Sequence, residues 1–179
     1  MHSRLEEILA YLARVRSELA TLIASTPREA FSRRTDERAW TGAQIVYHCG
    51  SVEGATTKML EGLFAKALAD GLPADENTGS LLHSLDHLRV PDRSGPRVEA
   101  PERLRPPADP DLDASWASLQ KVRERTHRAV ATVDGRDLTR LSAPHPIFGP
   151  LNAYEWVLII GQHEERHLGQ LRETVLGKQ

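Results

Sequence analysis

Two histidines near the end of the chain have the spacing of a metal-binding pair. The letters HEERH run from His163 to His167, inside the segment WVLIIGQHEERHLGQL. Residues four apart on a helix have Cβ atoms about 5–6 Å apart on one face. Two imidazoles at this spacing can both bind one zinc ion, with Zn–N bonds of about 2.0–2.1 Å. The alternative is that both rings bond only to backbone groups or to water.

A third histidine favours the metal site. His48 lies between Ile45 and Val52 on the apolar stripe of a helix expected earlier in the chain. Three histidines on the apolar stripes of two helices are better explained by one shared metal site than by a separate structural reason for each histidine. They leave a position open for water or substrate, as catalytic sites do. We therefore predict that His48, His163 and His167 bind a divalent metal, with zinc or nickel expected and iron or copper also compatible with imidazole ligands.

The same letters fit the H-E-x-x-H motif of zinc proteases, in which Glu164 would be the general base. Those enzymes normally take a third ligand well downstream, but only twelve residues follow His167. The nearest downstream acid, Glu173, lies on the same helix, and Gln170 stands where a metzincin has glycine. The sequence therefore disfavours a protease. Glu164 is offset by about 100° from His163 around the helix, so we expect it to be solvated, with ligand orientation or base catalysis as alternatives.

Other candidate residues have weaker signals. His145, in the connector LSAPHPIFGP, is a candidate for contacting the ligands or for lining a substrate pocket. His83 and His87 are also four apart, but they lie in a proline-rich segment and are predicted to be surface residues. Cys49 is predicted to be a small buried residue rather than a nucleophile or ligand. No catalytic residue is assigned, and the sequence contains no dinucleotide-binding, P-loop or nucleophile-elbow motif.

Four amphipathic helices would position these residues. Apolar residues recur at intervals of three and four across four segments: 5–23, 45–63, 112–133 and 156–175. Thr41 with Gln44, and Asn152 with Glu155, have the spacing of capping boxes at the start of the second and fourth helices. No stretch shows a sustained alternation of apolar and polar residues with a period of two, so no substantial sheet is expected. The prediction is an all-α four-helix bundle, formed as one domain over residues 1–179.

A long connection separates the second and third helices. Residues 72–110 hold seven of the eleven prolines, so no long helix can run through them. A short helix is expected around GSLLHSLDHL. Loops of this length are usually functional or lie across a core. We predict a proline-rich crossover.

Composition narrows the class of protein. The 179 residues carry 23 basic and 25 acidic side chains, for a net charge of −2. This balance gives no reason to expect a nucleic acid or an anionic membrane as partner. A single cysteine excludes an internal disulfide, and no apolar run approaches the roughly 20 residues of a membrane-spanning helix. We expect a cytoplasmic protein that acts on a small molecule.

The motifs resemble those of the DinB-like superfamily over nearly the whole chain. AWTGAQIVYHCGSVE resembles its pattern W-[ST]-x-x-[EQ]-[IV]-x-x-H. APHPIFGPLNAYEWVLIIGQHEERHLGQL resembles H-P-x-F-G-x-L-[TN]-x-x-E-W followed by H-x-x-x-H-x-x-Q, and RVEAPERLRPP resembles the family crossover. The resemblance implies a metal-binding four-helix bundle with His48, His163 and His167 as ligands. The family name reflects damage-inducible expression and does not imply DNA binding.

The resemblance also implies an activity. Relatives include metal-dependent S-transferases that activate a low-molecular-weight thiol such as bacillithiol or mycothiol, and a thiol-dependent isomerase. The expectation is therefore thiol transfer, with metal-dependent hydrolysis or a non-catalytic structural or sensory bundle as alternatives. Relatives often pair, so a homodimer is expected.

Overall fold

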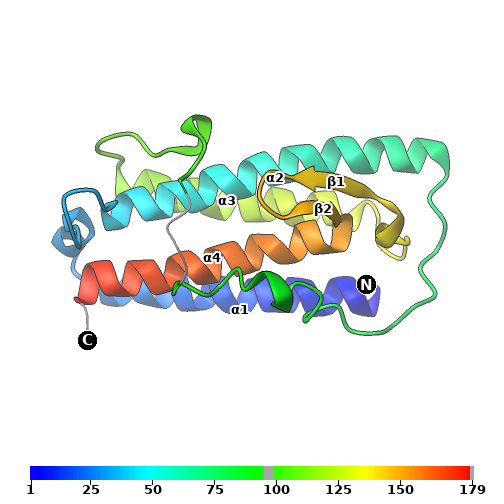
Figure 1. The fold of residues 1–179 in the computed structure, drawn as a ribbon, viewed down its shortest axis with the longest axis horizontal. Helices are drawn as coiled ribbons and strands as arrows, with labels where there is room; N and C mark the ends of the chain where they lie inside the picture. The colour runs from blue at the N-terminus through cyan, green and yellow to red at the C-terminus, as the bar shows by residue number, and fades with distance from the viewer. Residues whose placement is uncertain (95–98, 178–179) are drawn as a thin grey trace.

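The protein is a mainly helical four-helix bundle, as the sequence predicts (Figure 1). The computed structural model describes residues 1–94 and 99–177. Helices α1 and α4 run in one direction along the bundle, and α2 and α3 run in the other (Figure 1). The long helices are α1 (Ser3–Ser25), α2 (Gly42–Asp70), α3 (Leu112–Ala131) and α4 (Ala153–Leu176).

The ends of α2 and α4 follow from local sequence signals. Both predicted capping boxes are confirmed: Gln44 N donates to Thr41 Oγ1 at 3.2 Å, and Glu155 N donates to Asn152 Oδ1 at 3.1 Å. The reciprocal bonds, from Thr41 N to Gln44 Oε1 and from Asn152 N to Glu155 Oε2, measure 2.9 and 2.8 Å. Gly71 ends α2 with φ +85°, a left-handed conformation that glycine adopts without a steric penalty.

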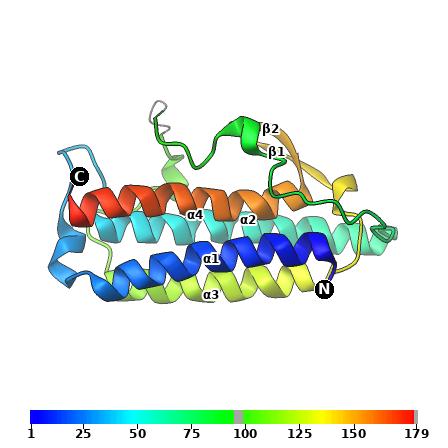
Figure 2. The same ribbon diagram turned by 90° about the horizontal axis from the view of Figure 1, so that it is seen from below.

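Because α2 and α3 point the same way, the chain between them returns along the bundle. Its described residues include two 3-10 helices, η2 (Asp86–Leu88) and η3 (Glu102–Leu104). The segment around η2 lies beside α4 (Figures 1 and 2), and Leu85 and Val90 are buried there. The short helix expected over 79–88 is reduced to η2. The predicted crossover includes residues 95–98, outside the described residues, and over its full length it stays a prediction.

The apolar stripe predicted for α2 is partly wrong. Val52 and Ala55 belong to the predicted stripe within 45–63, but Val52 is half-buried and Ala55 is exposed. Glu53 and Thr57 are buried instead. The reason is that the core-facing side of α2 includes a charged residue, because the buried Glu53 carboxylate pairs with two arginines from other helices. A hydrophobic pattern cannot detect such a face.

A small antiparallel hairpin, β1 (Ser142–His145) with β2 (Gly149–Asn152), leads directly into α4. Two further 3-10 helices, η1 (Arg28–Ser32) and η4 (Leu138–Arg140), follow α1 and α3. In the described part of the chain, no helix combines the length and apolar character needed to cross a membrane.

Candidate metal centre

Helices α2 and α4 bring the three predicted ligands together. One possible ligand atom from each of His48, His163 and His167 lies within 4.8 Å of the other two. The ring centroids are 4.4 Å apart for His163 and His167, 4.9 Å for His48 and His167, and 5.1 Å for His48 and His163. His48 is buried, and the two histidines of α4 are partly buried. The group can hold a metal ion, and ligation itself stays a prediction.

Hydrogen bonds orient two of the three rings. Nδ1 of His48 lies 2.9 Å from the carbonyl oxygen of Leu104 in η3, and Nδ1 of His167 lies 2.8 Å from Oε1 of Gln170. Both oxygens only accept, so each Nδ1 carries the hydrogen and each Nε2 keeps its lone pair. Metal-binding histidines usually donate their second ring N–H to an oxygen in this way. Gln170 was not predicted to have this role, although its position three residues after His167 on the same helix was the available signal.

Burial favours the neutral form of all three histidines of the site. Burial lowers the pKa of His48, partly offset by its bond to the Leu104 carbonyl. Burial, and then repulsion from the neighbouring histidines, lowers the pKa of His163 well below its usual value. Burial and then His48 lower the pKa of His167 to about 3. A neutral imidazole has the lone pair that a metal needs, and three of them add no negative charge.

An aromatic side chain closes one side of the site. Trp40 lies just before α2. The centroid of its ring is 4.6 Å from that of the His48 ring and 6.3 Å from that of the His167 ring. One turn before His48 on α2, Gln44 Nε2 donates to the carbonyls of Pro107 and Ala108 at 2.8 and 3.1 Å. These bonds hold the end of the chain that connects α2 to α3 against α2. Trp40 belongs to the W-[ST] pattern, but no role at the site was predicted for it.

His145 is near enough to His163 to affect its pKa, and its hydrogen lies on the other ring nitrogen than in His48 and His167. Its Nδ1 accepts from the backbone N–H groups of Ile147 and Phe148, at 3.2 and 3.3 Å, so Nε2 carries the hydrogen. The centroid of its ring is 4.7 Å from that of Phe148 and 5.0 Å from that of the Trp156 ring. Burial lowers the pKa of His145. Trp156 and His163, seven residues apart, share a face of α4. In this tautomer His145 is a hydrogen-bond donor rather than a fourth ligand through Nε2.

The prediction that Glu164 is solvated is wrong. Its side chain is only 3% exposed and points to the bundle core. Oε1 accepts from Arg16 Nε at 2.6 Å, and Oε2 accepts from Arg123 Nη2 at 2.6 Å. The reason is that α4 has more than one buried face, so a residue about 100° from His163 still meets the core. Because both carboxylate oxygens are engaged by arginines, the residue is unsuited to the general-base role that the protease interpretation needs.

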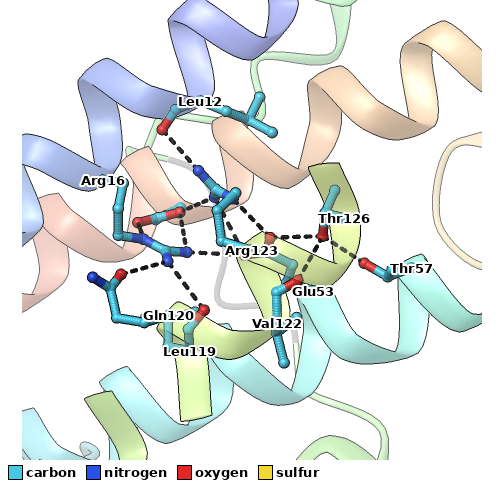
Figure 3. A network of polar contacts seen from close by, with 10 residues as sticks. Leu12, Arg16, Glu53, Thr57, Leu119, Gln120, Val122, Arg123 and Thr126 are labelled. Carbon is cyan, nitrogen blue, oxygen red and sulfur yellow. Dashed lines mark hydrogen bonds and ion pairs between the residues drawn. The ribbon is translucent and has the colours of Figure 1, made fainter. Parts of the chain in front are cut away.

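Glu164 belongs to a charged core cluster of Arg16, Glu53, Arg123 and Glu164, one residue from each long helix. Glu53 Oε1 accepts from Arg123 Nε at 2.7 Å, and Glu53 Oε2 accepts from Arg16 Nη2 at 2.9 Å. Thr126 also donates to Glu53 at 2.9 Å (Figure 3). Opposite charges thus alternate around a closed ring of four side chains.

Comparison with known proteins decides the family. The sequence model of the DinB superfamily matches residues 11–171. The chain belongs to the DinB superfamily. It is 28% identical over 146 residues to the uncharacterized protein YuaE of Bacillus subtilis (strain 168), covering 81% of this chain and 83% of that protein. The crystal structure of TT2238, a four-helix bundle protein, superposes with a TM-score of 0.63 at 23% identity, covering 93% of this chain and 97% of that one. This last likeness supports the fold alone.

The remaining predicted positions of this DinB-superfamily chain lie away from the site or are inert. His83 and His87 are exposed, as predicted, and His83 pairs with Asp86 at 2.8 Å. Cys49 is buried, also as predicted, and burial raises the pKa of its thiol. A buried neutral thiol is a poor nucleophile.

Proposed function

We propose that this DinB-superfamily protein binds a divalent metal ion, zinc or nickel, at His48, His163 and His167, and uses it to activate a low-molecular-weight thiol for transfer to an electrophile. The observation that carries the proposal is the convergence of three ligand atoms within 4.8 Å. The Nδ1–H groups of His48 and His167 are already bonded to oxygen, which leaves both Nε2 lone pairs available.

The surroundings favour a thiol over water as nucleophile. When bound, a divalent ion lowers the pKa of a thiol or water molecule at the open position. A thiol starts from a pKa of about 8.5 and water from about 15.7, so a thiol has less need of a separate base. The carboxylate next to the ligands, Glu164, is held by Arg16 and Arg123. Thiol transfer therefore fits these residues better than hydrolysis.

Two side chains have roles in substrate binding under this proposal. His145 would offer its Nε2–H to a polar group of the substrate, because its Nδ1 is occupied by two backbone donors. Trp40 would supply an apolar surface beside His48. The identity of the thiol, a cytoplasmic location and a homodimeric assembly stay predictions from the family resemblance and the composition.

The test is a thiol-transfer assay on purified protein of known metal content. Elemental analysis would measure the bound metal, and bacillithiol or mycothiol would be supplied with a fluorogenic electrophile. We expect turnover that is lost on chelation, restored by adding the ion back, and lost in His163→Ala. Metal-dependent hydrolysis without any thiol would replace this proposal with a hydrolase. A protein that neither contains nor binds metal would contradict both enzymatic functions.

A further inference from the structure

The charged core cluster lies next to the histidine site on the same two helices. Glu164 directly follows His163 on α4, and Glu53 follows His48 by five residues on α2. At 1.5 Å per residue, these offsets amount to about 1.5 Å and 7.5 Å along the helix axes. Both α2 and α4 therefore turn one face to the histidine site and another to the cluster, and the two lie within about one and a half helical turns of each other along the bundle.

The cluster constrains how the helices are rotated. Arg16 bonds to both carboxylates and Arg123 does the same, so each guanidinium joins α2 to α4. The arginines also donate to backbone: Arg123 Nη1 to the Leu12 carbonyl at 2.9 Å and Arg16 Nη1 to the Leu119 carbonyl at 3.1 Å. A guanidinium is a planar fork with fixed donor directions, so these bonds fit a narrow range of helix rotations. Apolar side chains would tolerate a wider range.

Stability alone does not account for such a cluster. Buried ion pairs lose the hydration of every charge, and replacing them with apolar residues of similar volume is often neutral or stabilising. The best-attested use of buried charge is to specify one register among several packings. In this bundle the register matters for function, because His48 reaches the other two histidines only when α2 and α4 have the right relative rotation.

We propose that the charged core cluster is a positioning device for the metal site: it holds α2 and α4 at the rotation where His48 meets His163 and His167. Glu164 of HEERH is then a positioning residue rather than a base. This inference rests on the proposed metal site and adds what sets its geometry.

The first test compares metal affinity with stability in Glu164→Gln. Zinc would be titrated into metal-free protein against a competing chelator, at a temperature where circular dichroism shows the variant folded. We expect zinc to bind about tenfold more weakly, the lower end of the effect seen for groups that orient metal ligands.

The matched control is Asp75→Asn. Asp75 accepts from Arg4 at 3.1 Å and from Tyr154, near the start of α4, at 2.6 Å, and its side chain is buried. This variant disturbs a buried ion pair that also contacts α4, away from the histidines. It should lower the free energy of unfolding and leave zinc affinity within about twofold of wild type, as expected for distant sites.

A charge-balanced variant protects the test against simple misfolding. Arg16→Met with Glu164→Leu removes one charge of each sign and leaves the Arg123–Glu53 pair. We expect it to recover stability relative to Glu164→Gln and still bind zinc more weakly than wild type. Wild-type zinc affinity in both cluster variants would overturn the positioning role and leave the metal site intact. A wild-type chain that binds no zinc would overturn the metal site itself, and with it this inference.

Discussion

The histidine site and the charged core cluster share helices α2 and α4, yet their polar atoms are satisfied in opposite ways. In the cluster, each carboxylate accepts hydrogen bonds from both arginines. In the site, Nδ1 of His48 and Nδ1 of His167 are bonded to other groups, and one possible ligand atom from each of the three histidines lies within 4.8 Å of the other two. A buried polar group is normally paired. The paired cluster therefore binds the helices to one another, whereas a gathering of acceptors is suited to a cation.

The largest expected effect is on the stability that the cluster supports. Glu53→Ala should lower the free energy of unfolding by about 3–5 kcal/mol, because it leaves two buried guanidinium groups short of a partner. Urea denaturation of the metal-free protein would measure it. The control is Glu61→Ala, which breaks a more exposed pair with Arg125 between α2 and α3, the two helices that the Glu53–Arg123 pair also joins. That change should cost at most about 1 kcal/mol, and equal costs for the two variants would contradict the contrast between buried and surface pairs.

The second prediction concerns the site. His163→Ala should weaken zinc binding by more than about a hundredfold, beyond the range for groups that only orient ligands. The expected cause is loss of one of three ligands, and calorimetry with a chelating competitor would measure it. His83→Ala is the matched control, since His83 is exposed and its Nδ1 lies 2.8 Å from the carboxylate of Asp86. A comparable loss in both variants would indicate non-specific binding by surface histidines.

A smaller effect should appear in the pH dependence of stability. The pKa of His167 is about 3 in the folded protein, against 6.5 ordinarily. Between these values the unfolded chain binds a proton that the folded chain excludes, so stability rises with pH there and falls on acidification from about 6.5. The slope from this residue is at most about 1.4 kcal/mol per pH unit.

The check is urea denaturation of metal-free protein between pH 7 and pH 5. His167→Gln should flatten the pH dependence relative to wild type, because glutamine does not titrate. An unchanged slope in the variant would show that His167 is not held neutral by the fold. The comparison between the two regions would then lose its electrostatic basis.

Much of this structure was predictable because its signals are local. The helix starts at Thr41 and Asn152 each depend on residues three apart. The HxxxH spacing places His163 and His167 on one face, and the position of His48 on an apolar stripe was enough to assign it to the same site. In each case the information lies within one turn or one face of a single helix.

The charged core cluster was not predictable in the same way. The partners of Glu164 are 148 and 41 residues away, on α1 and α3. Hydrophobicity treats a charged residue as exposed, and α4 has more buried surface than one apolar stripe. The available signal was that Arg16 and Arg123 each lie four residues after a buried leucine, which places charge on a core face. The Leu104 carbonyl that orients His48 is a backbone group, so its side chain could not indicate it.

The most direct test of the account is the contribution of His48, the one proposed ligand on α2. Zinc would be titrated against a chelating competitor into metal-free wild-type protein and into His48→Ala, with folding checked by circular dichroism. We expect a single zinc ion per wild-type chain and zinc binding weakened by more than about a hundredfold in the variant, beyond the effect of groups that only orient ligands. Equal affinity in the two proteins would contradict it, because the pair on α4 would then take its third ligand from elsewhere.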